Sequence, residues 1–214
     1  MKRRTLDILF SIGGLGLAGL LLLVGMVFTS NANFANDYVT QQLSQQNITF
    51  KPLNALTPEE KAKPGLVKYA GQKLTTGKQA EVYANEFIGL HLESTAGGKT
   101  YAELGTVQTD LRARVAEAQK AGAANVADLQ KQLTEVTAQR ETVFKGETLR
   151  GLLLTSYGFS EMGAKAEQAA TVAYTAAGLL FLLSLAGLVH GFMTPKTVAF
   201  AAPDKVQEKI PAAV

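Results

Sequence analysis

An apolar run from Ile8 to Phe28 limits the possible folds of this chain more than any other feature. The run carries no charged residue. As a helix rising about 1.5 Å per residue, it is long enough to cross a hydrocarbon core of about 30 Å. A lone span must be helical, because lipid offers no partners to backbone N–H and C=O groups. A second apolar run, from Ala169 to Met193, predicts a second transmembrane helix.

Basic residues at the ends of the chain predict the orientation of the two spans. Lys2, Arg3 and Arg4 precede the first run, Lys196 follows the second, and such positive flanks stay in the cytoplasm. We therefore predict a plasma-membrane protein with both termini cytoplasmic. Its parts are a cytoplasmic N-terminus at 1–7, transmembrane helices at 8–28 and 169–193, an extracytoplasmic domain at 29–168 and a cytoplasmic tail at 194–214.

The first run also has features of a cleaved signal peptide. A basic segment precedes it, and Ser30-Asn31-Ala32 is a tolerable cleavage context. Its apolar stretch, however, is longer than the roughly 7–15 residues usual in a signal peptide. We therefore expect an uncleaved anchor.

Capping signals predict that the domain between the spans is mainly helical, so that the whole protein is all-α. Thr57 with Glu60, and Thr100 with Glu103, each have the spacing of a capping box at the start of a helix. A further amphipathic helix is expected over 78–92. Its predicted buried face consists of Ala80, Tyr83, Phe87 and either Leu90 or His91.

A helical hairpin, here called the arm, is predicted at about 101–145 with its turn at Gly122. Apolar residues on the second half follow the alternating three- and four-residue spacing of a coiled coil. They are Val126, Leu129, Leu133, Val136 and, after Arg140 at the next position of the pattern, Val143, opposite Leu111, Val115 and Ala118 on the first half. Because the pattern covers fewer than three heptads, two ordinary amphipathic helices packed on the domain fit it equally well.

Small residues form a stripe on each predicted span. Such stripes let membrane helices approach closely, so they face either each other or partner helices. The high general frequency of small residues in spans is the alternative explanation. The candidate helix-packing residues are Ser11, Gly14, Ala18 and Gly25 on the first span, and Ala173, Ala177, Ser184, Gly187 and Gly191 on the second.

Composition argues against several kinds of function. The chain has no cysteine, which excludes disulfides, thiolate metal sites and cysteine nucleophiles. Its two histidines, His91 and His190, are far apart and predicted on opposite sides of the membrane, which argues against a histidine-rich metal site. A net charge of +3 without a clustered basic face does not suggest nucleic-acid binding. We expect no enzymatic activity, cofactor or metal.

Three segments resemble a family of uncharacterised actinobacterial two-span membrane proteins: KYAGQKLTTGKQAEVYANEFIGLHL, GGKTYAELG and FKGETLRGLLLTSYGF. The resemblance covers roughly Asn36 to Phe159, apart from about 106–138, and implies an N-terminal span, an outer helical region and a C-terminal span. Some members carry a label as aromatic ring-opening dioxygenases. Such iron sites need His and carboxylate ligands on one metal, and His91 is the only histidine of the predicted domain. The resemblance therefore implies a topology and no activity.

These features together predict a non-catalytic accessory or structural subunit of a larger membrane assembly. Its partners are expected to be other membrane proteins or further copies of the chain, with the lipid bilayer around its spans. The alternative is an extracytoplasmic sensor or ligand-binding receptor. Because the tail at 194–214 is too short for an output domain, a receptor would need a separate cytoplasmic partner.

Overall fold

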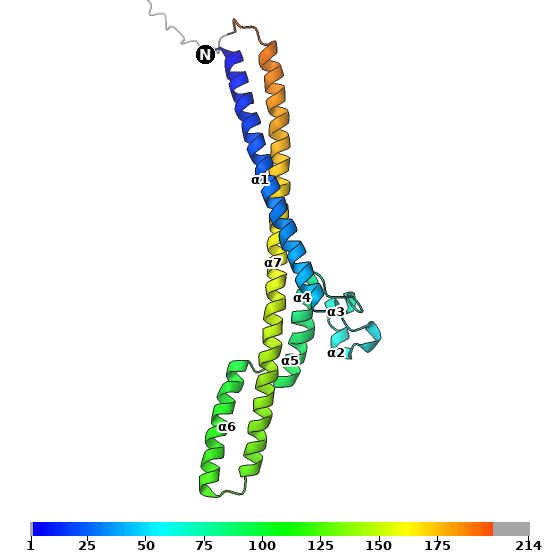
Figure 1. Ribbon diagram of the computed structural model, residues 1–214, viewed down its shortest axis with the longest axis vertical. Helices are drawn as coiled ribbons and strands as arrows, with labels where there is room; N and C mark the ends of the chain where they lie inside the picture. Colours follow the sequence, from blue (N-terminus) through cyan, green and yellow to red (C-terminus); the bar gives the residue numbers. More distant parts are fainter. Residues whose placement is uncertain (1, 199–214) are drawn as a thin grey trace, which may run out of the picture. The chain divides into compact units, whose positions relative to one another are not determined.

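The computed structural model describes residues 2–198, and its named elements are all helical, which confirms the predicted all-α class (Figure 1). Thr49 and Lys73 form an isolated antiparallel bridge. Most of the predicted tail at 194–214 lies outside the described residues. The elements in chain order are α1 (Arg3–Gln45), a 3-10 turn (Leu53–Ala55), α2 (Pro58–Lys61), α3 (Pro64–Lys68), α4 (Gly77–Val82), a π-helical segment (Tyr83–Ile88), α5 (Gly89–Ala96), α6 (Tyr101–Ala121) and α7 (Val126–Met193).

Helices α1 and α7 contain the two apolar runs and extend well beyond them. Both are long and apolar enough to cross a membrane. Helix α1 has 43 residues and continues past Phe28 to Gln45. Helix α7 has 68 residues, so the second half of the arm and the second apolar run belong to one uninterrupted helix. The sequence between Val126 and Met193 contains no proline, and Pro195 is the second residue after the helix ends.

The described residues divide into two compact units. The middle unit comprises Ala32–Lys165, and the terminal unit comprises the residues up to Asn31 together with those from Ala166 onward. In the terminal unit, α1 and α7 lie side by side. The middle unit contains the short helices α2 to α5, the helix α6, the last turns of α1 and the first part of α7.

The middle unit has an apolar core to which both long helices contribute. Helix α1 supplies Val39 and Leu43, and α7 supplies Leu153. The rest of this core comes from the segment between 50 and 88, namely Phe50, Leu56, Leu66, Leu74, Ala80, Ala84 and Ile88. The Phe50 ring meets the Tyr83 ring edge-on, with centroids 5.3 Å apart. The short helices are thereby packed onto α1 and α7.

Local capping begins the helices where the sequence predicts, and the predicted buried face of 78–92 is confirmed in part. Thr57 and Thr100 each form the expected capping box. Tyr83 and Phe87 are half-buried against the core as predicted, but the fully buried positions after Ala80 are Ala84 and Ile88, and His91 is exposed. The reason is the π-helical segment Tyr83–Ile88, which adds residues to a turn and so rotates the following positions away from an ordinary helical stripe.

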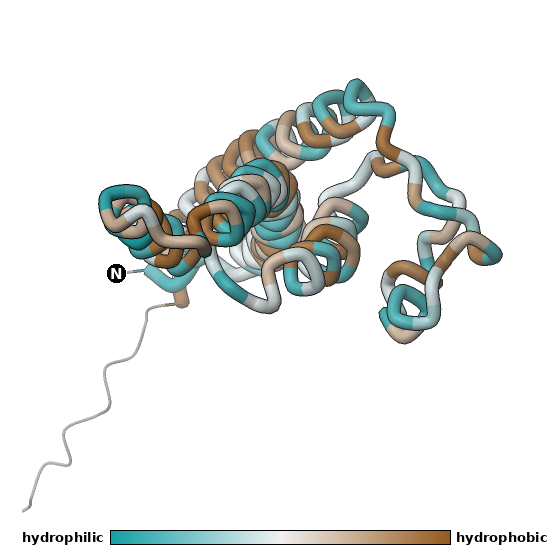
Figure 2. Tube along the Cα trace, turned by 90° about the horizontal axis from the view of Figure 1, so that it is seen from below, coloured by the Kyte–Doolittle hydropathy of each residue, from teal (hydrophilic) through white to brown (hydrophobic). Residues whose placement is uncertain are grey.

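The arm is a hairpin of α6 and the first turns of α7, with its turn at Gly122 as predicted (Figure 1). Gly122 has φ 62°, a left-handed conformation that favours glycine. Leu111, Val115 and Leu129 are buried in a core distinct from that of the short helices, and Leu133 and Val136 pack against it. Polar residues interleave with these apolar ones along the sequence of both arm helices. Figure 2 shows hydrophilic and hydrophobic residues alternating within helical turns of the chain.

A polar network fixes the register of the arm near its base. Gln108 is buried, and its Nε2 donates to Thr137 Oγ1 at 2.7 Å across the hairpin. Arg140 Nη1 donates to Gln108 Oε1 at 2.9 Å, and the guanidinium lies 4.1 Å from the centroid of the Tyr101 ring. A slip of either helix would leave the buried amide unpaired, which is costly in a low-dielectric environment.

Because the arm has its own small core, we predict that Leu129→Ala combined with Leu133→Ala unfolds the arm alone. Truncating a well-packed leucine costs about 2–5 kcal/mol, and the half-buried Leu133 contributes less than Leu129. Limited trypsin digestion should then cut quickly at Lys120 and Lys131, while the core around Leu66 and Leu74 resists. Gln130→Ala combined with Gln132→Ala, at exposed positions of the same turn, should leave digestion unchanged. Loss of all protease resistance in the leucine variant would show instead that the arm is part of the main core.

Candidate functional site

Helices α1 and α7 approach closely in the terminal unit because glycines on one helix face hydroxyl-bearing side chains on the other. Gly14 packs against Ser184, and Gly187 packs against Ser11. A Cβ atom placed on Gly25 would lie 2.5–2.9 Å from carbon atoms of the Tyr174 ring. No larger side chain fits at these three positions without displacing the facing residue.

Six of the nine small residues selected from the sequence contact the opposite helix, namely Ser11, Gly14, Gly25, Ser184, Gly187 and Gly191. Gly191 packs against Asp7 and Ile8. The other three, Ala18, Ala173 and Ala177, are buried. The two stripes could face each other or face partner helices, and in the structure these contacts join the stripe of α1 to that of α7. The outward faces of both helices carry the exposed large apolar side chains, such as Phe10, Leu20 and Leu183.

Three contacts of the terminal unit were not predicted from the sequence. Tyr174 Oη and Thr29 Oγ1 lie 3.0 Å apart, and His190 Nδ1 lies 3.1 Å from Asp7 Oδ2. The Arg4 guanidinium lies over the Phe192 ring at 5.8 Å from its centroid. Of these contacts, only the one made by Asp7 had a signal in the sequence. A carboxylate directly before an apolar run needs a polar or cationic partner.

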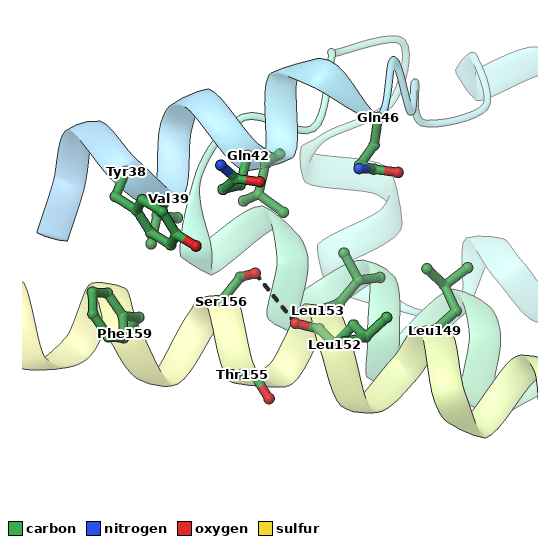
Figure 3. A pocket seen from close by; sticks show the side chains of 11 residues that line it. Tyr38, Val39, Gln42, Gln46, Leu149, Leu152, Leu153, Thr155, Ser156 and Phe159 are labelled. Carbon is green, nitrogen blue, oxygen red and sulfur yellow. Dashed lines mark hydrogen bonds between the residues drawn. The ribbon is translucent and has the colours of Figure 1, made fainter.

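The middle unit contains an apolar groove of about 300 Å³ between the last turns of α1 and the part of α7 from Leu149 to Phe159 (Figure 3). Leu43 and Leu153 are buried in its floor. The side of α7 that lines it includes Leu152, which is 64% exposed. The remaining lining residues are Tyr38, Val39, Gln42, Gln46, Leu149, Thr155, Ser156 and Phe159.

Exposed aromatic side chains continue the apolar surface beside this groove. Phe34, which is 63% exposed, stacks on Tyr38 with ring centroids 5.9 Å apart. The Tyr38 ring in turn lies 5.8 Å from that of Phe159. The sequence indicates that 149–159 is rich in apolar residues, but only the structure separates the buried Leu153 from the exposed Leu152.

Glu60 is the one ionisable residue with a fully buried side chain among those described, and its contacts are structural. Its carboxylate, 1% exposed, accepts from Lys51 Nζ at 2.7 Å and from the backbone N–H of Thr57 at 2.8 Å. Burial acts to raise the pKa of this carboxyl, but these hydrogen bonds outweigh it and hold the pKa below its usual value. Glu60 is therefore charged at neutral pH and ties the segment around Lys51 to the start of α2.

His91 lies next to this carboxylate. Its Nε2 is 3.4 Å from Glu60 Oε1, and its Nδ1 is 2.7 Å from the carbonyl oxygen of Phe87. The described residues contain no group of three or more His, Asp or Glu side chains placed to hold a metal ion. Both ring nitrogens of His91 therefore lie close to oxygen atoms of the middle unit.

No protein-family model matches the chain, and the searches of curated proteins and of solved structures also return no match.

The glycine contacts predict a sharp difference between neighbouring positions of α1. Gly14→Leu should destabilise the α1–α7 contact, because overpacking costs about 1–3 kcal/mol and Ser184 lies directly opposite. Gly13→Leu is the matched control, since a Cβ there meets no described atom within 4 Å. Thermal unfolding in detergent should show a lower midpoint for the Gly14 variant and an unchanged one for the Gly13 variant. Equal midpoints for the two variants would contradict the observed helix contact.

Proposed function

We propose that this protein is a non-catalytic accessory or structural subunit of a larger membrane assembly. In this proposal 8–28 and 169–193 cross the plasma membrane, the domain at 29–168 is extracytoplasmic, and both termini are cytoplasmic. The observation that carries the proposal is the open apolar groove of the middle unit, bordered by Leu152 and by the aromatic rings of Tyr38 and Phe159.

Lipid is a poor candidate to cover this groove. Both Leu149 and Leu152 lie at least about four helical turns before Ala169, where the second apolar run begins. If that run fills the hydrocarbon core, these leucines belong to the aqueous side. A contiguous apolar patch in water is the usual mark of a protein contact surface.

A helix from another membrane protein is the partner that best suits the groove. The groove lies between two helices, and a third helix packs favourably into such a depression when it presents an apolar stripe. Gln42, Gln46, Thr155 and Ser156 line the groove beside the apolar residues and offer hydrogen bonds at the edge of such a contact. A second copy of the chain is the less favoured partner.

Two other surfaces that could bind a partner are already covered by contacts within the chain, which supports the groove as the partner-binding surface. The arm core is sealed by its own residues, and the small-residue stripes of α1 and α7 face each other. Neither feature is therefore left open for a partner, whereas the groove is. The resemblance over Asn36 to Phe159 implies the same two-span arrangement and adds no activity.

Replacement of one groove residue tests the proposal. Leu152→Gln should weaken partner association at least about ten-fold, because burial of a leucine side chain is worth about 1.5–3 kcal/mol. Leu53→Gln is the matched control, since Leu53 is 54% exposed but does not line the groove. The measurement is purification of the full chain from its own membranes in nanodiscs, with a photo-crosslinker at Thr155 and mass spectrometry of the crosslinked protein.

The expected result is one defined membrane protein crosslinked to the wild-type chain and to Leu53→Gln, and strongly reduced for Leu152→Gln. A product of twice the chain mass would identify a homo-oligomer and overturn the choice of partner. A clean monomer without a crosslinked partner would contradict the proposed function.

A further inference from the structure

We propose that the terminal unit binds an anionic phospholipid in a pocket between the first turns of α1 and the residue Lys196. The pocket has a volume of about 410 Å³. This inference relies on the membrane location in the proposed function, but it concerns a different surface and a different ligand from the groove.

The pocket combines a cationic part with an apolar wall. Lys2 and Arg4 of the N-terminal segment and Lys196, just after α7, supply three positive charges. The backbone N–H of Arg3 donates to the carbonyl of Val198 at 3.3 Å, a contact that holds the segment containing Lys196 beside the start of α1. The lysines and Arg4 are thus gathered from sequence positions almost two hundred residues apart.

The apolar wall follows directly along α1. It consists of Ile8, Leu9 and Ile12, at the beginning of the apolar run. Leu9 is 59% exposed and Ile12 is 58% exposed, so both are open to a ligand. From residue 2 to residue 12 a helix rises by about 15 Å, a length that spans a phosphate headgroup and the first part of an acyl chain.

The charges of the pocket select an anion. Among residues 2–198, which the structure describes, the lining includes no carboxylate. The nearest acidic residue in the sequence, Asp7, is engaged by His190 at 3.1 Å and packs against Gly191 instead. Lysine and arginine donate to phosphate oxygens, and Thr5 in the lining adds a hydroxyl. A phosphodiester with a neutral glycerol headgroup satisfies these groups, whereas the cation of a choline headgroup would be repelled.

Lipid retention by the purified full chain tests this inference. Native mass spectrometry in detergent would compare dioleoylphosphatidylglycerol with dioleoylphosphatidylcholine. The wild-type chain should retain the anionic lipid preferentially. Arg4→Gln combined with Lys196→Gln should weaken that retention by about five-fold for each cation removed. Arg112→Gln combined with Arg114→Gln removes the same charge from the arm and should leave the preference unchanged. Should the first double variant melt early, Lys2→Gln alone should still show the five-fold loss.

Several outcomes would overturn the inference. One is an equal retention of the two lipids by the wild-type chain. Another is an equal loss in the two double variants, which would indicate a general effect of charge. Displacement of the lipid by an equal concentration of glycerol phosphate would show a free-anion site without a role for the apolar wall.

Flotation of the wild-type chain with phosphatidylcholine vesicles separates failure of this inference from failure of the membrane location. If the chain floats but shows no lipid preference, only the lipid site is refuted. If it does not float, the membrane location fails and the lipid site fails with it. Crosslinking at the groove tests partner association independently of both results.

Discussion

Close approach of α1 and α7 through small side chains is the interaction on which the rest of the structure depends. If these helices cross a membrane, as we propose, the hydrophobic effect does not drive their association. The association then relies on dispersion contacts and on paired polar groups. The contacts of Gly14 with Ser184 and of Gly187 with Ser11 provide the first, and the pairs Thr29–Tyr174 and Asp7–His190 provide the second. The same two helices also supply Val39, Leu43 and Leu153 to the core of the middle unit.

Features with strong local signals could be predicted from the sequence. Apolar length gives the two long helices, the spacing of Thr57 with Glu60 gives a helix start, and Gly122 between two apolar stripes gives the hairpin turn. The small-residue stripes could also be found, because periodicity places their members on one face of a helix. Periodicity alone does not say which surface such a stripe meets, and this required the structure.

Other features depend on contacts between distant residues and have no local signal. The continuity of α7 is one. Glycine is a weak helix former, yet the helix continues without interruption through the glycines at 146, 151, 158 and 163. The π-helical segment at Tyr83–Ile88 is another, and with it Ala84 and Ile88 become fully buried while Tyr83 and Phe87 are only half-buried. The groove combines side chains from α1 and α7 that are more than one hundred residues apart in the sequence, so its existence could not be inferred from either helix alone.

The side of the membrane on which each part of the chain lies is the most direct test of the account, because the proposed roles of the groove and of the cationic pocket both depend on it. The chain has no cysteine, so single cysteines are unique labels. Lys131→Cys, in the arm, should react with a membrane-impermeant maleimide in intact cells. Ala201→Cys should react only after the membrane is opened. Labelling in the reverse pattern, or of both positions in intact cells, would contradict the account.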